Sequence, residues 1–252
     1  MSNSNLCMLT CYSAIFVTER YPLKTIGLIG GMSWEGSLLY YQLINNAVKQ
    51  RLGGMHSAQL LMYSVDFAPI EKLQHAGDWG GVARVMVDAA RRLEAGGADF
   101  FLIGSNTMHQ VADVVSAAVD IPLLHIADAT AENLKRDDIE RIGLLGTAFT
   151  MELDFFSNRL SDQLGIEVVV PEVHDRQMVH DIIFQELCQG QIEPESREVY
   201  LAIIDRLREQ HIDGVILGCT EIGLLLQPQH TDIKLYDTTV IHAHRAVELA
   251  LQ

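Results

Sequence analysis

Two short polar motifs in the sequence could perform chemistry, and each directly follows a run of apolar residues. Residues 219–221 read Cys-Thr-Glu, and residues 105–107 read Ser-Asn-Thr. A free cysteine has a pKa near 8.5, so only about 3% of it is the reactive thiolate at pH 7, and full ionisation costs roughly 2 kcal/mol. A helix N-terminus and neighbouring donors can supply that much. Cys219 is therefore a candidate base or nucleophile, whereas the hydroxyl of Ser105 needs a partner base before it acts.

Both residues also have a purely structural interpretation. Free cysteines are among the most buried residues and most are inert, and Ser105 could simply cap a following helix. The position of Cys219 after an apolar run, in a slot that recurs in the first half of the chain, favours a functional thiol. The amide and hydroxyl groups of Asn106, Thr107 and Thr220 are suited to binding a substrate carboxylate.

The elements that must position these motifs follow an α/β pattern. Short apolar runs rich in β-branched residues alternate with longer segments of helical period, which is typical of a mostly parallel sheet covered by helices. The predicted strands are residues 25–29, 59–65, 100–103, 123–126, 142–145, 166–170, 214–217 and 234–236. The predicted fold class is α/β.

The order of the motifs indicates an internal repeat. The matching pairs are residues 25–30 with 141–146, residues 99–105 with 213–219, and Asp128-Ala-Thr130 with Asp237-Thr-Thr239. These ordered matches favour a duplication that gives two pseudo-symmetric lobes, each a mostly parallel sheet flanked by helices. The predicted division is residues 1–23 as an irregular extension, residues 24–118 plus 231–252 as lobe 1, and residues 119–230 as lobe 2.

The repeat predicts an active site in the cleft between the lobes. Ligands gather beyond the carboxyl ends of parallel strands, so Ser105 and Cys219 are expected to face each other across one cleft. This arrangement suits chemistry in which a stereocentre is approached from two faces. Met32 and Ser33 lie in a glycine-rich turn and are expected to face an anion, with a simple N-cap as the alternative. Thr147 is their counterpart in the repeat.

The motifs resemble those of the aspartate/glutamate racemases, within the broader aspartate/glutamate/hydantoin racemase superfamily. The matching segments are residues 30–34 (Gly-Gly-Met-Ser-Trp), 106–109 (Asn-Thr-Met-His) and 218–222 (Gly-Cys-Thr-Glu-Ile). The resemblance runs from about residue 24 to the C-terminus. It implies a racemase that needs no pyridoxal phosphate, with two cysteines flanking the substrate's α-carbon. Carried over, Cys219 is the second-lobe base, and Ser105 stands where the first-lobe cysteine is expected.

This departure predicts one-sided chemistry. Cys219 is expected to remove the proton of an L-amino acid, while Ser105 or a water molecule returns one on the other face. The predicted substrate contacts are Met32, Ser33, Asn106, Thr107, Thr147, Thr220 and Glu221. Glu221 and Asp66 are candidates for orienting the substrate ammonium, and His109, one helical turn beyond Ser105, could tune the site or be a solvated histidine.

The resemblance implies L-aspartate or L-glutamate as the substrate, whose side-chain carboxylate should meet a cation. Many relatives place a basic residue two positions before the glycine that closes a second-lobe helix. That slot here is Cys188, so the choice between aspartate, glutamate and neither stays open. Arg51 and Lys72 are the substitute cations to test.

Composition limits the remaining classes of function. A formal charge of −15 argues against nucleic acid or an anionic membrane surface as a partner, and no apolar run is long enough to cross a bilayer. Four scattered cysteines predict a reducing, cytoplasmic location without a disulfide framework. We expect no cofactor and no metal, and a homodimer is compatible with the sequence. The rival hypotheses are a single-cysteine decarboxylase or cis–trans isomerase of the same superfamily, and a non-catalytic binder of small dicarboxylates.

Overall fold

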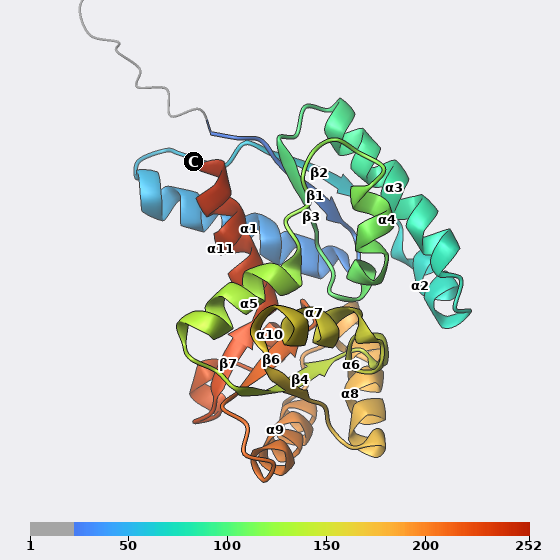
Figure 1. Cartoon of the computed structure of the whole chain (residues 1–252), viewed down its shortest axis with the longest axis vertical. Helices are drawn as coiled ribbons and strands as arrows, with labels where there is room; N and C mark the ends of the chain where they lie inside the picture. Colours follow the sequence, from blue (N-terminus) through green and yellow to red (C-terminus); the bar gives the residue numbers. More distant parts are fainter. Residues whose placement is uncertain (1–22) are drawn as a thin grey trace, which may run out of the picture.

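The computed structural model describes residues 23–252, apart from the side chains of residues 163 and 164. The chain forms two lobes stacked one above the other, with α5 (Ile126–Arg136) and α11 (Thr238–Ala250) running between them (Figure 1). The extension predicted for residues 1–23 lies outside the described residues except for its last position.

Each lobe contains one fully parallel sheet, as the sequence predicts. The first sheet has the order β2-β1-β3, and the second has the order β5-β4-β6-β7. The strands are β1 (Ile26–Gly30), β2 (Leu60–Ser64), β3 (Phe100–Ile103), β4 (Arg141–Gly146), β5 (Glu167–Val169), β6 (Gly214–Gly218) and β7 (Lys234–Asp237). The central strands β1 and β6 are buried along their whole length, because helices cover both faces of each sheet.

Helices enclose the sheets and separate the strands in sequence. Those of the first lobe are α1 (Trp34–Leu52), α2 (Phe67–His75), α3 (Trp79–Ala95), η1 (Thr107–Val111) and α4 (Ala112–Ser116). After α5 come α6 (Ala148–Glu152), α7 (Asp154–Leu164), α8 (Val173–Gln185), η2 (Leu187–Gln189), α9 (Pro194–Arg208), α10 (Ile222–Leu225), η3 (Pro228–His230) and α11. Side chains of β1 and β3 alternate between the two faces of the first sheet. One set packs against α3, and the other packs against α1 and α11.

The repeated strands β1 and β4 each contain a glycine for the same physical reason. A Cβ atom added at Gly27 would lie 3.1 Å from the Cβ atoms of Ala98 and Phe101, and one added at Gly143 would lie 2.9 Å from Cδ1 of Ile212. Both glycines therefore allow a neighbouring segment to approach the sheet closely. The match between residues 25–30 and 141–146 therefore reflects the same need for close packing in both lobes.

One predicted strand, residues 123–126, is wrong. Leu123 makes only an isolated parallel bridge with Phe101, and α5 begins at Ile126. The side chain of His125 caps this helix by accepting a hydrogen bond from the backbone N–H of Ala127. An N-cap side chain satisfies a backbone donor that a continuing strand would have to pair elsewhere.

The third repeat match is also out of register. Asp237 caps α11, whereas Asp128 lies within the first turn of α5. The structural counterpart of Asp237 is therefore His125, three residues earlier. An apolar run followed by Asp-x-Thr could not distinguish these two positions.

The lobe boundaries predicted at 118/119 and 230/231 differ from the sheets that the structure forms. Leu123, predicted in lobe 2, bridges to the sheet of the first lobe. Strand β7, predicted in lobe 1, pairs with β6 in the sheet of the second lobe. The chain crosses between lobes just after these segments, where His125 and Asp237 cap the two connecting helices. Assignment of α11 to the first lobe agrees with its packing against α1.

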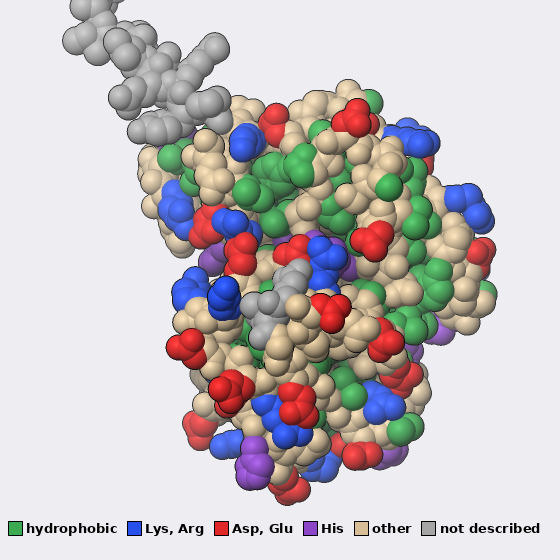
Figure 2. Space-filling model, in the orientation of Figure 1, with side chains coloured by type: hydrophobic (Ala, Val, Ile, Leu, Met, Phe, Trp, Pro, Cys, Tyr) green, Lys and Arg blue, Asp and Glu red, His purple; other side chains and the backbone are tan. Residues whose placement is uncertain are grey.

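The surface carries both signs of charge. Acidic and basic side chains are interspersed over both lobes on the face that Figure 2 shows. Within residues 23–252, no helix is long and apolar enough to span a membrane.

Candidate active site

The carboxyl ends of strands from both lobes meet around one small cavity. It measures about 330 Å³ including its open mouth. Met32 follows β1, Ser105 follows β3, Thr147 follows β4 and Cys219 follows β6. The residues that line the cavity are Met32, Phe67, Ser105, Asn106, Thr107, Thr147, Ile183, Phe184, Cys188, Gly218, Cys219, Thr220 and Glu221. The structure thus brings Ser105 and Cys219 into the wall of the same cavity, one from each lobe.

Glu221 is the centre of a buried hydrogen-bond cluster beside the thiol. Its Oε2 accepts from Sγ of Cys219 at 3.0 Å and from Oγ1 of Thr220 at 2.5 Å. Its Oε1 accepts from Oγ of Ser33 at 2.6 Å, across the boundary between the lobes. The residue Glu221 is 1% exposed. Both carboxylate oxygens therefore have partners within the protein, and one of those partners is the candidate base.

This environment raises the pKa of Cys219 well above its ordinary value. Burial is the largest cause, and the negative charge of Glu221 is the next. A buried thiolate loses hydration and would lie beside a carboxylate, so the resting side chain is the neutral thiol. The sequence predicts neighbouring donors that favour the thiolate, but burial and the Glu221 carboxylate favour the neutral thiol instead.

The turn after β1 is built around Gly31 and Ser33. Gly31 has a φ of +94°, and a Cβ atom there would lie 2.2 Å from the carbonyl oxygen of Val65. The peptide bond between Met32 and Ser33 is cis. Ser33 caps α1, because its hydroxyl accepts a hydrogen bond from the N–H of Gly36; this agrees with the alternative prediction that Ser33 is an N-cap. Met32 lines the cavity, whereas Ser33 does not, and the Ser33 hydroxyl donates to Glu221. Contact of either residue with a substrate stays a prediction.

Three threonine hydroxyls bridge the lobes at the cavity. Oγ1 of Thr107 lies 2.9 Å from Oγ1 of Thr147 and 3.2 Å from that of Thr150. Thr147 also caps α6, since its hydroxyl accepts from the N–H of Thr150. Each hydroxyl can rotate its proton toward a new acceptor. Thr107 and Thr147, which line the cavity, can therefore donate to an anionic group placed there.

Asn106 leaves one buried polar atom without a partner among residues 23–252. Its Nδ2 donates to Oγ1 of Thr238 at 3.0 Å, but its Oδ1 is buried and has no hydrogen bond to any described residue. Buried acceptors are rarely left unpaired in native proteins, because burial without a partner costs on the order of 1–3 kcal/mol. An N–H donor on a bound ligand would satisfy this oxygen.

His109 is a buried support for the first-lobe motif. Its Nδ1 bonds to the carbonyl oxygen of Ser105 at 2.8 Å, and its Nε2 accepts from the N–H of Ile126 at 3.2 Å. Burial lowers the pKa of His109 to about 4, so the ring is neutral at pH 7 with its proton on Nδ1. The two bonds tie Ser105 to the start of α5, and His109 is not the solvated histidine of the alternative interpretation.

Several other predicted residues lie away from the cavity wall. Asp66 caps α2 by accepting from the N–H of Ala68. Arg51 forms an ion pair with Glu248, and Lys72 is exposed on α2. Cys188, the slot expected to hold a cation, does line the cavity.

Three lining residues were missed in the sequence: Phe67, Ile183 and Phe184. They come from the start of α2 and the last turn of α8 rather than from strand ends. A search of the strand-end motifs alone could not find them. The apolar run Ile182-Ile183-Phe184, which ends four residues before Cys188, was the one available signal.

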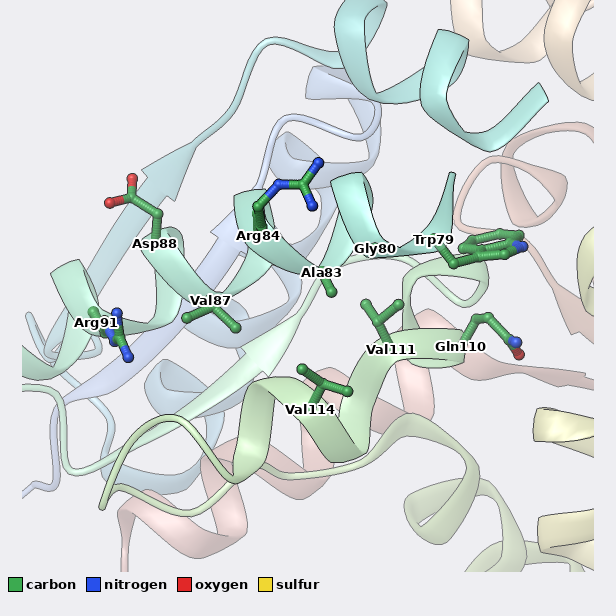
Figure 3. Close-up of a pocket in the computed structure, with 10 residues that line it drawn as sticks. All are labelled: Trp79, Gly80, Ala83, Arg84, Val87, Asp88, Arg91, Gln110, Val111 and Val114. Atoms are coloured by element: carbon green, nitrogen blue, oxygen red, sulfur yellow. The ribbon is translucent and has the colours of Figure 1, made fainter. Parts of the chain in front are cut away.

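A larger hollow lies elsewhere, on the outer side of the first lobe. It is a groove of about 1080 Å³, including open solvent, between α3 and α4. Figure 3 shows Ala83, Val87, Val111 and Val114 directed toward one another across this groove. None of the described residues that line it is a cysteine, serine or threonine, so the smaller cavity is the candidate active site.

Comparison with known proteins agrees with this geometry. The profile of the Asp/Glu/Hydantoin racemase family matches residues 29–246, which include both polar motifs and the glycine-rich turn. The chain belongs to this racemase family.

Two solved structures share the fold of this chain, and a further relative matches it in sequence. A candidate Asp/Glu racemase from Yersinia pestis is 50% identical with a TM-score of 0.84, covering 91% of this chain and 100% of that chain. An aspartate racemase homologue from Pyrococcus horikoshii OT3 is 34% identical with a TM-score of 0.79, again covering 91% and 100%. Broad specificity amino-acid racemase RacX from Bacillus subtilis (strain 168) is 24% identical over 69% of this chain and 74% of its own length. Membership of the racemase family was predicted from the motifs and is confirmed.

Proposed function

We propose that this protein is a cofactor-independent amino-acid racemase that acts from one side, on the L-enantiomer of its substrate. The observation that carries the proposal is the thiol of Cys219, which bonds to Glu221 at 3.0 Å in a cavity whose wall also contains Ser105. Family membership supports an α-amino acid as the substrate. The resemblance gives the second-lobe thiol the L-face and gives the first-lobe position, Ser105, the D-face.

Polar groups of the cavity match the two charged groups that all α-amino acids share. The Oδ1 atom of Asn106, which has no partner among the described residues, can accept from the substrate ammonium. The hydroxyls of Thr107 and Thr147 can donate to the α-carboxylate. These contacts would hold the α-carbon between the two lobes while leaving its side chain to be recognised separately.

Proton transfer begins at the Cys219–Glu221 pair. The thiol passes its proton to Oε2 of Glu221, and the resulting thiolate removes the proton from the α-carbon. The arriving substrate ammonium offsets the negative charge that otherwise disfavours the thiolate. The carbanion then takes a proton on its other face from Ser105 or from a water bound there. Glu221 releases its proton to solvent, which balances the proton that solvent supplies on the Ser105 side.

Exchange of the α-proton in D₂O tests this function directly. Purified protein is incubated with L-aspartate, L-glutamate and neutral L-amino acids, and deuterium at the α-carbon is followed by NMR. We expect uptake from at least one L-amino acid and formation of its D-enantiomer. Because a curated relative is a broad specificity amino-acid racemase, the panel must extend beyond the two acidic substrates that the resemblance implies.

The same panel separates the rival functions. A decarboxylase that protonates an enolate-like intermediate with one thiol would release CO₂ from a malonate, and an isomerase would convert maleate. Binding of dicarboxylates without exchange, CO₂ release or isomerisation would identify a non-catalytic protein and would contradict the proposal.

Substitution Ser105→Cys is expected to add activity toward the D-enantiomer. A cysteine thiol is a far stronger acid than a serine hydroxyl, so residue 105 could then remove a proton from the opposite face. We expect α-proton exchange of the D-enantiomer to rise by about 10²-fold over wild type, measured by NMR in D₂O. The matched variant Ser105→Ala should show no such gain. A folded Ser105→Cys protein without a gain would mean that residues 105 and 219 do not reach opposite faces of one carbon.

A further inference from the structure

One part of the cavity wall is apolar and comes from helices. Phe67 begins α2, Ile183 and Phe184 end α8, and Cys188 lies in η2. The rings of Phe67 and Phe184 are stacked, with centroids 6.4 Å apart and planes 15° from parallel. Met32 adds a thioether to the same lining. The polar strand ends can bind the ammonium and the α-carboxylate, and this apolar wall is left for the substrate side chain.

The electrostatic field beside this wall is negative. Glu221 lines the cavity, and Glu35, in the first turn of α1, has a buried Oε2 without a hydrogen-bond partner among the described residues. After burial, these two carboxylates are the causes that raise the pKa of Cys188. A substrate carboxylate placed at Cys188 would lose its hydration and would also be repelled by both glutamates.

Of the two substitute cations predicted from the sequence, Lys72 is exposed on α2 and neither residue lines the cavity. An α-helix rises about 1.5 Å per residue, so Arg51 lies roughly 26 Å along α1 from Trp34, and it is paired with Glu248. Arg197, on α9, donates its Nε–H to the carbonyl oxygen of Leu225. The described residues that line the cavity therefore include no lysine, arginine or histidine, although the rings of His75 and His180 contact Phe184 from behind the lining.

We infer that the preferred substrate of this site is an L-amino acid with an uncharged, apolar, non-aromatic side chain, such as leucine or methionine. The inference rests on the proposed racemase function and specifies the substrate class of the same site. The side chain would pack against Phe67, Phe184 and Cys188, where removal of apolar surface from water favours binding. An acidic side chain would gain no ion pair there, and a small cavity disfavours large aromatic substrates.

Rates of α-proton exchange for matched substrates test the inference. We expect kcat/KM for L-methionine or L-leucine to exceed that for L-aspartate and L-glutamate by at least about tenfold, and to exceed that for L-lysine similarly. Faster exchange of L-aspartate or L-glutamate would overturn the inference and leave the racemase function intact. Faster exchange of L-lysine would also overturn it, because the negative field would then dominate recognition. Exchange with no amino acid would instead overturn the proposed function.

A pair of variants at Cys188 separates charge from size. Lysine and methionine have unbranched side chains of similar length, but only lysine supplies a cation. We expect Cys188→Lys to raise kcat/KM for L-aspartate relative to L-methionine by at least about tenfold, and Cys188→Met to leave that ratio in favour of L-methionine. If both variants shift the ratio toward L-aspartate equally, charge at this wall does not determine specificity and the inference fails.

Discussion

Replacement of Cys219 by alanine is expected to lower α-proton exchange by at least about 10⁴-fold, to the background rate. The other thiol among the described lining residues, Cys188, comes from η2 rather than from a strand end, and burial and two carboxylates raise its pKa, so it is a poor substitute for the sulfur of Cys219. The hydroxyls of Thr220 and Ser33 both donate to the Glu221 carboxylate, and they are much weaker acids than a thiol. The measurement is deuterium uptake at the α-carbon of the best L-substrate, at saturating and at low concentration.

The fold should survive this change. Glu221 keeps hydrogen bonds from Ser33 and Thr220 when the thiol is removed, so its buried charge stays partnered. We expect Cys219→Ala to lower the free energy of unfolding by about 1 kcal/mol, measured by urea denaturation. The matched variant Cys219→Ser restores a donor to Glu221 and should be close to wild type in stability, yet equally inactive. Substantial exchange by either variant would show that another group is the base.

Much of the fold could be predicted because buried parallel strands have a strong local pattern. Continuous apolar runs such as β1 and β6 are buried on both faces, and the glycines of the repeated strands record close packing. Residues 123–126 have the same apolar character, but here the side chain of His125 accepts a hydrogen bond from the N–H of Ala127 and so begins helix α5 in place of a strand. Whether such a run forms a strand depends on whether a neighbouring strand pairs with it in the folded protein, and the local sequence does not contain that information.

The site was predictable to the extent that it lies on strand ends. Ser105, Asn106, Thr107 and Cys219 follow apolar runs, and the repeat places them in one cavity. Phe67 and Phe184 reach the cavity from helices, and their stacking depends on how the two lobes meet. The direction of the pKa shift at Cys219 was equally hidden, because it depends on burial and on the rotamer of Glu221 rather than on the motif Cys-Thr-Glu itself.

Replacement of Glu221 by glutamine is expected to change the pH dependence of catalysis as well as its rate. In the wild type the thiol can pass its proton directly to Oε2 of Glu221, 3.0 Å away. This transfer releases no proton to solvent, so kcat/KM should be nearly flat between about pH 6.5 and 8.5, although the pKa of Cys219 is raised. In Glu221→Gln the thiol must lose its proton to solvent, and kcat/KM should rise about tenfold per pH unit below the thiol pKa.

The size and the sign of this effect follow from two opposing changes. The amide removes a negative charge that raises the pKa of Cys219, which by itself would favour the thiolate. It also removes the proton acceptor, and general-base contributions of about 10²–10⁴-fold are typical, so we expect a net loss of about 10²-fold at pH 7. The burial that is the largest cause of the raised pKa remains in the variant, so the rising limb should extend above pH 8.5.

The control is Glu152→Gln, which removes a carboxylate that pairs with Arg176 on the surface of the second lobe. Its loss changes the net charge by the same amount as Glu221→Gln without touching the thiol, so its profile should stay flat. A wild-type profile that already rises tenfold per pH unit would mean that the Cys219 proton leaves to solvent. Glu221 would then act only by holding the thiol in place, and its contact with Ser33 would be a link between the lobes rather than part of proton transfer.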